Sequence, residues 1–208
     1  ASRMDTVNCR NVFLAGCGIA PSRLARARQV HGVDIHYADA GYLAAHGADA
    51  PQQWPAGDGL VTDVPGIALG VTVADCVPLW IFDPVRKALG VFHAGREGTV
   101  AGITSLGVHV MGDRFGCLAR HLVCLIGPSA GPCCYEVSEE MAGELASLGF
   151  PVLNRKLDLW ESSRRQLTGA GVPAEQVFVS GECTLCGDSF HSFRKSGSAA
   201  RNLAVGMM

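Results

Sequence analysis

The sequence lacks the features that would place it in a membrane. No apolar run reaches the ~18 residues that a membrane span needs, because the longest candidate, 67–82, is interrupted by Asp75. The first four residues, Ala-Ser-Arg-Met, do not begin a positively charged and then apolar secretion signal. We therefore expect a cytoplasmic protein.

Charge is also scarce, at 17% of residues, and 17 Lys and Arg against 19 Asp and Glu give a formal net charge of −2. Without a basic excess, nothing draws the chain electrostatically to nucleic acid or to an anionic membrane. Hydrophobic residues make up 48%, enough apolar surface to exclude a disordered chain. The length of 208 residues predicts one domain over 5–208, and we interpret residues 1–4 as a remnant of cloning.

The cysteines and histidines also lack the patterns of a disulfide-bonded or multicopper protein. Nine cysteines are an odd number, which favours reduced thiols, most of them small core residues. The pair Cys183-x-x-Cys186 lacks the second pair that a structural zinc site requires. The seven histidines form no His-x-His pair, although the trinuclear copper cluster of a multicopper oxidase needs several.

Strand patterns outnumber helix patterns and do not alternate regularly with them. The segment 29–37 alternates apolar and polar residues, and several short apolar runs are rich in β-branched residues, as in buried strands. The predicted strands are 29–37, 66–73, 77–82, 87–92, 122–126, 177–179 and 202–205, and the predicted helices are 8–14, 100–111, 139–148 and 161–170. The Pro- and Gly-rich stretch 41–59 is predicted to be a surface loop. These elements indicate an α+β fold of mixed, sandwich-like β-sheet layers flanked by helices.

Three predicted strand ends carry reactive side chains. They supply two imidazoles and a thiol, from His31, Cys76 and His93. Three nitrogen and sulfur ligands leave one tetrahedral position open, which is typical of a catalytic zinc site. The same residues also fit a cysteine hydrolase, with Cys76 as nucleophile and His93 as base, or a plain hydrogen-bonded core.

The stretch 93–99 has a second use. Its glycines precede a predicted helix, whose free backbone N–H groups could hold a phosphate. Glu97 places a carboxylate at the same positive end, so an ordinary helix start remains the alternative.

The chain resembles a known family in five blocks. These are Gln-Val-His-Gly at 29–32, Thr-Val-Ala-Asp-Cys-Val-Pro at 72–78, His-Ala-Gly at 93–95, Ile-Gly-Pro-Ser-Ala-Gly-Pro-Cys-Cys-Tyr-Glu-Val at 126–137, and Cys-Thr at 183–184 with Phe-His-Ser-Phe-Arg at 190–194. They resemble, in order, the signature of the laccase-domain (YfiH-like) family, whose members are also called polyphenol oxidases or purine nucleoside phosphorylases.

This resemblance implies a mixed α/β sandwich and a metal, usually zinc, held by His31, Cys76 and His93. It implies phosphorolysis of adenosine, inosine and methylthioadenosine, with adenosine deamination as a companion activity. The expected partners are thus a purine nucleoside and phosphate, and the expected assembly is a monomer or homodimer. A copper-dependent oxidation of phenols is the alternative activity, since copper binds such ligands more tightly than zinc.

Site roles follow from the resemblance as hypotheses. Besides the metal ligands, Asp75 either orients an imidazole or caps a turn, with equal weight. The substrate contacts are assigned to Gln29, Arg96, Cys133 and Arg194, with either zinc or Arg194 orienting phosphate. Plain packing is the alternative for Cys133.

The chain also departs from the family pattern. Arg96 and Glu97 replace the family's Trp-Arg after His-Ala-Gly, and the family's leading Ser-x-Arg-x-Gly-Gly segment is absent. An aromatic platform is lost and an anion-binding charge is moved, so a non-catalytic metal-binding remnant stands as a further alternative.

Overall fold

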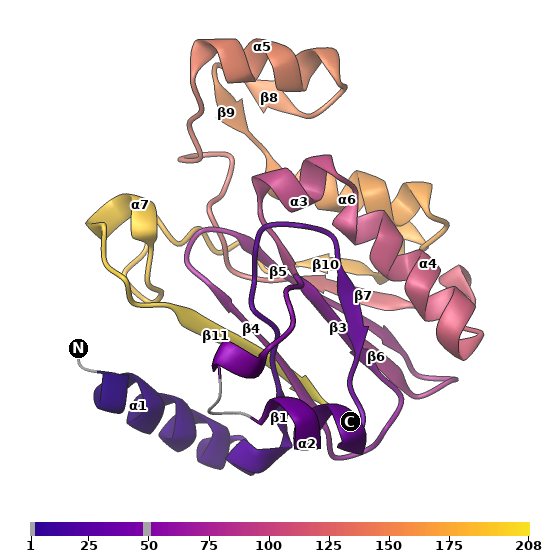
Figure 1. Ribbon diagram of the computed structural model, residues 1–208. Coiled ribbons are helices and arrows are strands. Elements are labelled where there is room, and N and C mark those ends of the chain that lie inside the picture. Colours follow the sequence, from indigo (N-terminus) through magenta and orange to yellow (C-terminus); the bar gives the residue numbers. More distant parts are fainter. Residues whose placement is uncertain (1–2, 48–50) are drawn as a thin grey trace.

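The computed structural model describes residues 3–47 and 51–208, with side chains from residue 7 onward. Four layers follow one another: one helix, a three-stranded sheet, a six-stranded sheet and a group of helices (Figure 1). Two of the three apolar cores lie on opposite faces of the six-stranded sheet, which is therefore the centre of the molecule. The α+β sandwich predicted from the sequence is confirmed.

The six-stranded sheet has β5 and β6 at its centre. Its order is β10-β7-β5-β6-β3-β2. The strands are β2 (Ile35–Tyr37), β3 (Gly59–Thr62), β5 (Val77–Asp83), β6 (Ala88–Ala94), β7 (Val123–Ile126) and β10 (Val177–Val179). β5 pairs antiparallel with β6, and this register sets Pro78 opposite His93. Cys76, just before β5, and His93, near the end of β6, consequently reach the same edge of the sheet.

The three-stranded sheet brings the C-terminal segment to that same edge. It has the order β1-β4-β11, with β1 (Leu24–Ala25), β4 (Ala68–Val73) and β11 (Asn202–Met207). β11 runs antiparallel to β4 and pairs Asn202 with Val73. The residues just before β11 therefore lie beside the residues just after β4.

Helices cover both outer faces. On the six-stranded sheet lie α3 (Arg96–Val100), α4 (Ile103–Phe115) and α6 (Leu159–Gly169). On the three-stranded sheet lies α1 (Arg3–Gly16), whose Leu14 packs with Leu24 and Ala68. The remaining helices are α2 (Ala40–His46), α5 (Glu139–Ser147) and α7 (Phe193–Ser196), and the 3-10 turns are η1 (Pro21–Arg23), η2 (Pro51–Gln53), η3 (Ala119–His121) and η4 (Ala174–Gln176).

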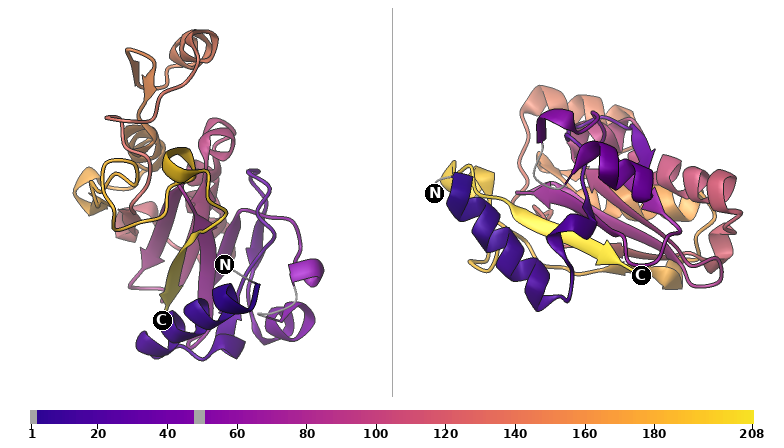
Figure 2. Two further views of the ribbon diagram at one scale, coloured as in Figure 1. Left: turned by 90° about the vertical axis from the view of Figure 1, so that its left-hand side faces the viewer. Right: turned by 60° about the horizontal axis from the view of Figure 1, so that its bottom comes forward.

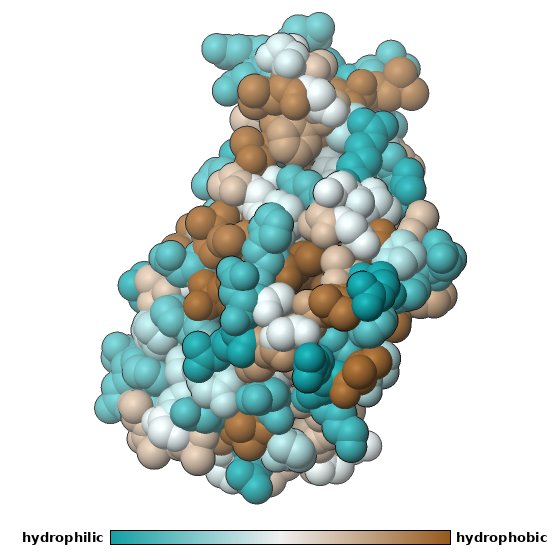
Figure 3. Space-filling view, turned by 90° about the vertical axis from the view of Figure 1, so that its right-hand side faces the viewer, coloured by the Kyte–Doolittle hydropathy of each residue, from teal (hydrophilic) through white to brown (hydrophobic). Residues whose placement is uncertain are grey.

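One segment extends away from the two sheets. α5 and the hairpin of β8 (Val152–Leu153) and β9 (Lys156–Leu157) extend away from the sheets (Figures 1 and 2). On the face that Figure 3 shows, hydrophobic side chains form small patches separated by hydrophilic ones. Of the helices in the described part of the chain, none is long and apolar enough to cross a membrane.

The structure corrects the prediction at three places. The half-buried strand expected over 29–37 is confined to Ile35–Tyr37. The loop expected over 41–59 contains most of α2 and the fully buried Asp58, and its last residue, Gly59, begins β3. Its residues 48–50 lie outside the described residues. The helix expected over 100–111 is divided between α3 and α4, because Gly102 adopts a left-handed φ of +87°.

α4 packs closely on β6 because two positions beside Phe92 are glycine. The Phe92 ring is fully buried. A Cβ at Gly107 of α4 would lie 2.9 Å from the Phe92 ring, and one at Gly90 of β6 would lie 2.6 Å from it. The helix can therefore approach the sheet only because these positions are glycine.

This packing predicts opposite effects for the same substitution in two helices. Gly107→Ala adds a methyl group against a rigid ring, an overpacking that costs ~1–3 kcal/mol and exceeds the ~1 kcal/mol gained in helix propensity. Gly143→Ala, where a Cβ would meet nothing within 4 Å, serves as the matched control. Urea unfolding should show a lower free energy of unfolding for Gly107→Ala and none lost for Gly143→Ala. Equal values for the two variants would contradict this account of the packing.

Candidate active site

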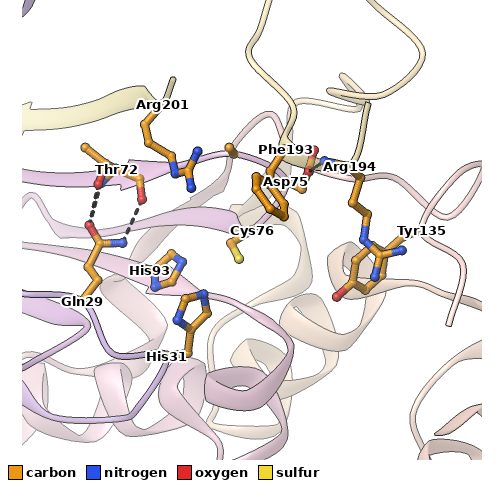
Figure 4. A pocket seen from close by; sticks show the side chains of 11 residues that line it. Gln29, His31, Thr72, Asp75, Cys76, His93, Tyr135, Phe193, Arg194 and Arg201 are labelled. Atoms are coloured by element: carbon orange, nitrogen blue, oxygen red, sulfur yellow. Dashed lines mark hydrogen bonds between the residues drawn. The ribbon is translucent and has the colours of Figure 1, made fainter. Parts of the chain in front are cut away.

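A cavity of about 460 Å³ opens at the shared edge of the two sheets, a volume typical of small-molecule sites (Figure 4). It lies between the ends of β4, β5 and β6 and the segment that precedes β11. Its lining consists of Gln29, His31, Thr72, Ala74, Asp75, Cys76, His93, Tyr135, Phe193, Arg194 and Arg201.

His31, Cys76 and His93 come together on one side of this cavity. Their ligand atoms all lie within 4.8 Å of one another, and the two imidazole rings meet edge to face with centroids 4.8 Å apart. The three residues differ in exposure, since His93 is buried, Cys76 is partly buried and His31 is exposed. The ligand set therefore has a buried end and an end that faces solvent.

Gly95 makes room for this convergence. A Cβ at this position would lie 3.0 Å from both the Cys76 Sγ and the His31 ring. The missing side chain leaves a hollow among two imidazoles and a thiol, which is the donor set that zinc and copper prefer. The residues present therefore fit a bound metal ion.

Asp58 orients two of the three ligands. Its carboxylate lies 2.7 Å from the His93 Nδ1, which leaves Nε2 as the ring nitrogen available to a metal. The same carboxylate accepts hydrogen bonds from the backbone N–H groups of Val30, His31 and Gly32. His31 adopts a left-handed φ of +61°, a strained conformation that these bonds help to hold.

Cys76 and His93 each stabilise the charged form of the other. Burial alone would raise the pKa of the Cys76 thiol, but hydrogen bonds from His31 and His93 lower that pKa to about 6. Burial alone would lower the pKa of His93, but Asp58 and Cys76 raise it to about 9. Without metal, Cys76 is consequently a thiolate beside a protonated His93 at neutral pH.

Asp75 holds the far wall of the cavity in place. It is buried, has a left-handed φ of +87°, and accepts a hydrogen bond from the Thr184 hydroxyl at 2.7 Å. Its second oxygen accepts the Arg194 N–H at 2.8 Å. Of the two roles weighed from the sequence, the orientation of an imidazole is carried out by Asp58 instead.

Aromatic rings and guanidinium groups form this far wall. The Arg194 guanidinium lies 4.3 Å from the centroid of the Tyr135 ring. The Arg201 guanidinium lies 5.5 Å from the Phe193 centroid. Both arginines line the cavity, with Arg201 drawn near His93 and Arg194 beside Tyr135 (Figure 4). Burial raises the pKa of Tyr135, so its hydroxyl stays protonated at neutral pH.

The residues assigned to substrate from the sequence fall into two groups. Gln29 and Arg194 line the cavity, although the Gln29 amide is bound to the Thr72 backbone at 2.8 Å. Arg96 and Cys133 do not line it. Arg96 donates to the Met141 sulfur at 2.7 Å and forms an ion pair with Glu97 at 2.9 Å.

Among the site residues to which sequence reasoning assigned no role are Asp58, Tyr135, Phe193 and Arg201. The available signal for Asp58 was a carboxylate immediately before a short apolar run, within a stretch that looked like a surface loop. Tyr135 and Phe193 stand inside the blocks at 126–137 and 190–194 that resemble the family, and nothing local marks Arg201.

Comparison with known proteins gives one consistent set of relatives. The family model described as multi-copper polyphenol oxidoreductase laccase matches residues 3–208. The chain is 34% identical over 214 residues to the purine nucleoside phosphorylase YlmD of Geobacillus stearothermophilus, covering 97% of this chain and 78% of that protein. It is 36% identical over 197 residues to a purine nucleoside phosphorylase of Deinococcus radiodurans, covering 92% and 72%.

Solved structures agree with these matches. The crystal structure of YlmD from G. stearothermophilus superposes with a TM-score of 0.90 at 33% identity, covering 99% of this chain and 81% of that one. The hypothetical protein YfiH of Bacillus licheniformis superposes with a TM-score of 0.87 at 32% identity, covering 97% and 80%.

The hydrogen bond between Asp58 and His93 predicts how Cys76 reacts. In chelator-treated protein, alkylation of Cys76 by iodoacetamide should rise with a midpoint near pH 6, because only the thiolate reacts. Asp58→Asn should move that midpoint upward, since His93 loses the carboxylate that keeps it protonated. Peptide mass spectrometry at each pH measures the modification, with exposed Cys17 as the internal control. The same midpoint in both proteins would contradict this coupling.

The hollow at Gly95 predicts an effect on metal affinity. Gly95→Ala places a methyl group among the ligands and should weaken zinc binding by on the order of 10-fold or more, comparable to other changes beside metal ligands. Competition with a chromophoric chelator measures the affinity, and Gly143→Ala is the control outside the site. Unchanged affinity in Gly95→Ala would show that the three ligands do not share an ion.

Proposed function

The chain belongs to the multi-copper polyphenol oxidoreductase laccase family, and from this premise we propose that it is a zinc-dependent purine nucleoside phosphorylase. Its substrates are adenosine, inosine and methylthioadenosine, and deamination of adenosine is a companion activity. The observation that carries the proposal is one cavity with two opposed walls. A set of metal ligands forms one wall, and cationic and aromatic groups form the other.

His31, Cys76 and His93 are the residues that would hold the metal. Bound there, a zinc ion would supply a Lewis acid and a means of activating water at neutral pH. Asp58 keeps the His93 ring in one orientation, and the buried position of both residues excludes water from behind the ligand set.

Arg194 and Arg201 supply the positive charge that phosphate requires. Both line the cavity, and a planar guanidinium binds phosphate oxygens in pairs. Arg96 is committed to Glu97 and to the sulfur of Met141, so it stands outside this role. The anion-binding charge that the replaced Trp-Arg pair would provide is in this way supplied from the C-terminal segment.

Phe193 and Tyr135 suit the purine base. Both rings line the cavity, and a planar base stacks favourably on an aromatic face. In phosphorolysis a phosphate oxygen bonds to the anomeric carbon while the glycosidic bond breaks, and its electron pair leaves with the base. The leaving base then needs a proton or a hydrogen-bond donor, and the protonated Tyr135 hydroxyl is placed to donate.

The proposal predicts strict dependence on phosphate. Base release from adenosine, inosine or methylthioadenosine should require phosphate and should yield ribose 1-phosphate, or its methylthio analogue, measured by chromatography. Cys76→Ala should lower kcat/KM by at least about 100-fold, the scale of losing a group that supports the transition state. Arg201→Ala should chiefly raise the KM for phosphate.

Arg96→Ala is the matched control, because it removes an arginine near the site that does not line the cavity. It should leave the KM for phosphate within a few-fold of the parent value. Base release that proceeds equally well without phosphate would contradict phosphorolysis, and ammonia release from adenosine would measure the companion deamination separately.

One observation favours a second candidate, a cysteine hydrolase. A Cys76 thiolate beside a protonated His93 that is bound to Asp58 has the arrangement of a nucleophile, a base and an orienting carboxylate. The two candidates differ in their response to a chelator. Full activity after complete metal removal, together with inactivation by alkylation of Cys76, would favour the hydrolase.

A further inference from the structure

Four cysteines form a second cluster outside the ligand set of the cavity. The sulfur atoms of Cys133, Cys134, Cys183 and Cys186 all lie within 4.8 Å of one another. The Cys186 Sγ is 3.3 Å from that of Cys133 and 3.2 Å from that of Cys134. Cys133 and Cys186 are exposed, so the cluster is not explained as apolar core packing.

Two turns carry these sulfurs, and backbone hydrogen bonds hold the turns side by side. In the first, the N–H groups of Cys134 and Tyr135 donate to the Gly131 carbonyl at 3.0 and 2.9 Å. In the second, Gly187 N–H donates to the Cys183 carbonyl at 3.2 Å.

The segments leading into the two turns are joined at Ser129. Its N–H donates to the Glu182 carbonyl at 3.2 Å, and its carbonyl accepts from Thr184 N–H at 3.0 Å. The four sulfurs are therefore brought together by a fixed framework rather than by side-chain freedom.

The surroundings of Cys183 suit anionic sulfur. The Gly131 N–H donates to the Cys183 Sγ at 3.3 Å, a bond that stabilises a thiolate. The Lys156 ammonium donates to the Cys133 carbonyl at 2.5 Å, and the Lys195 ammonium donates to the Gly187 carbonyl at 2.9 Å. One ammonium group therefore binds the backbone of each turn. Lys195 also pairs with Asp188, so Lys156 is the cation of the two that offsets part of the charge that four thiolates would bring.

The spacing fits one central ion. A Zn–S bond of ~2.3 Å in a tetrahedron places the sulfurs ~3.8 Å apart. The shortest S···S distance printed here is 3.2 Å and every separation is within 4.8 Å, so small movements of the side chains would bring the sulfurs to that spacing. Cys183 and Cys186 have the usual C-x-x-C spacing of such sites, whereas Cys133 and Cys134 are adjacent and reach the same point from one turn. We propose that these four cysteines bind a structural zinc ion, separate from the metal at His31, Cys76 and His93.

Such an ion would hold the far wall of the cavity. Cys134 directly precedes Tyr135, which lines the cavity, and Cys183 directly precedes Thr184, whose hydroxyl donates to Asp75. An ion joining the two turns would consequently fix Tyr135 relative to Asp75 without touching substrate.

Metal analysis in a background that lacks the first site tests this proposal. The double variant His31→Ala, Cys76→Ala, purified under reducing conditions, should retain about one zinc per chain by mass spectrometry. Adding Cys183→Ser and Cys186→Ser should remove that zinc. Adding Cys9→Ser and Cys17→Ser, two exposed cysteines outside the cluster, should leave it in place.

A measurement on the unaltered chain covers the case in which the cluster variants fail to fold. With zinc bound, Cys133, Cys134, Cys183 and Cys186 should resist N-ethylmaleimide while Cys9 and Cys17 react, and removal of zinc should expose all of them. Equal labelling before and after metal removal would overturn the proposal. So would an intact mass that is lower by two hydrogens per disulfide, or a double variant that carries no metal.

Discussion

The site depends on the hydrogen bonds that the buried carboxylate of Asp58 accepts. It receives three backbone N–H groups from the loop that carries His31, and it contacts the His93 ring at 2.7 Å. The Asp58 carbonyl also accepts the His93 N–H at 2.7 Å. Burial opposes the ionisation of this carboxylate, but the hydrogen bonds from His93, Gly32 and Val30 outweigh burial and lower its pKa. One charged group thereby fixes a strained loop, one imidazole and the electrostatics of Cys76.

Strand pairing in the two sheets brings together the site residues that Asp58 does not contact. Pairing of β5 with β6 delivers Cys76 and His93 to one edge, and pairing of β11 with β4 delivers the arginine-bearing segment to the same edge, on another wall of the cavity. The candidate metal ligands and the cationic wall thus come from different layers of the sandwich. A cavity between layers can combine groups that lie more than a hundred residues apart in the chain, as His31 and Arg201 do.

The sequence reveals those parts of this arrangement that local patterns encode. Apolar runs rich in β-branched residues predict β4 and β5 because strands buried on both faces have that pattern. The burial and the role of Asp58 cannot be predicted from local patterns, because its Pro- and Gly-rich surroundings look exposed and its partners are distant in sequence. The four-cysteine cluster cannot be predicted locally for the same reason. One C-x-x-C pair is visible in the sequence, but the turn that completes the cluster is about fifty residues earlier.

The central claim is that His31, Cys76 and His93 share one metal ion while Asp58 holds His93 from behind. A crystal structure of the zinc-loaded protein, with anomalous data at the zinc edge, tests it most directly. The account predicts a peak ~2.0–2.3 Å from the Cys76 sulfur and one nitrogen of each histidine, with the His93 Nδ1 still on Asp58. A structure from zinc-saturated protein with no peak among these three residues, or with the His93 Nδ1 on the metal instead of Asp58, would contradict it.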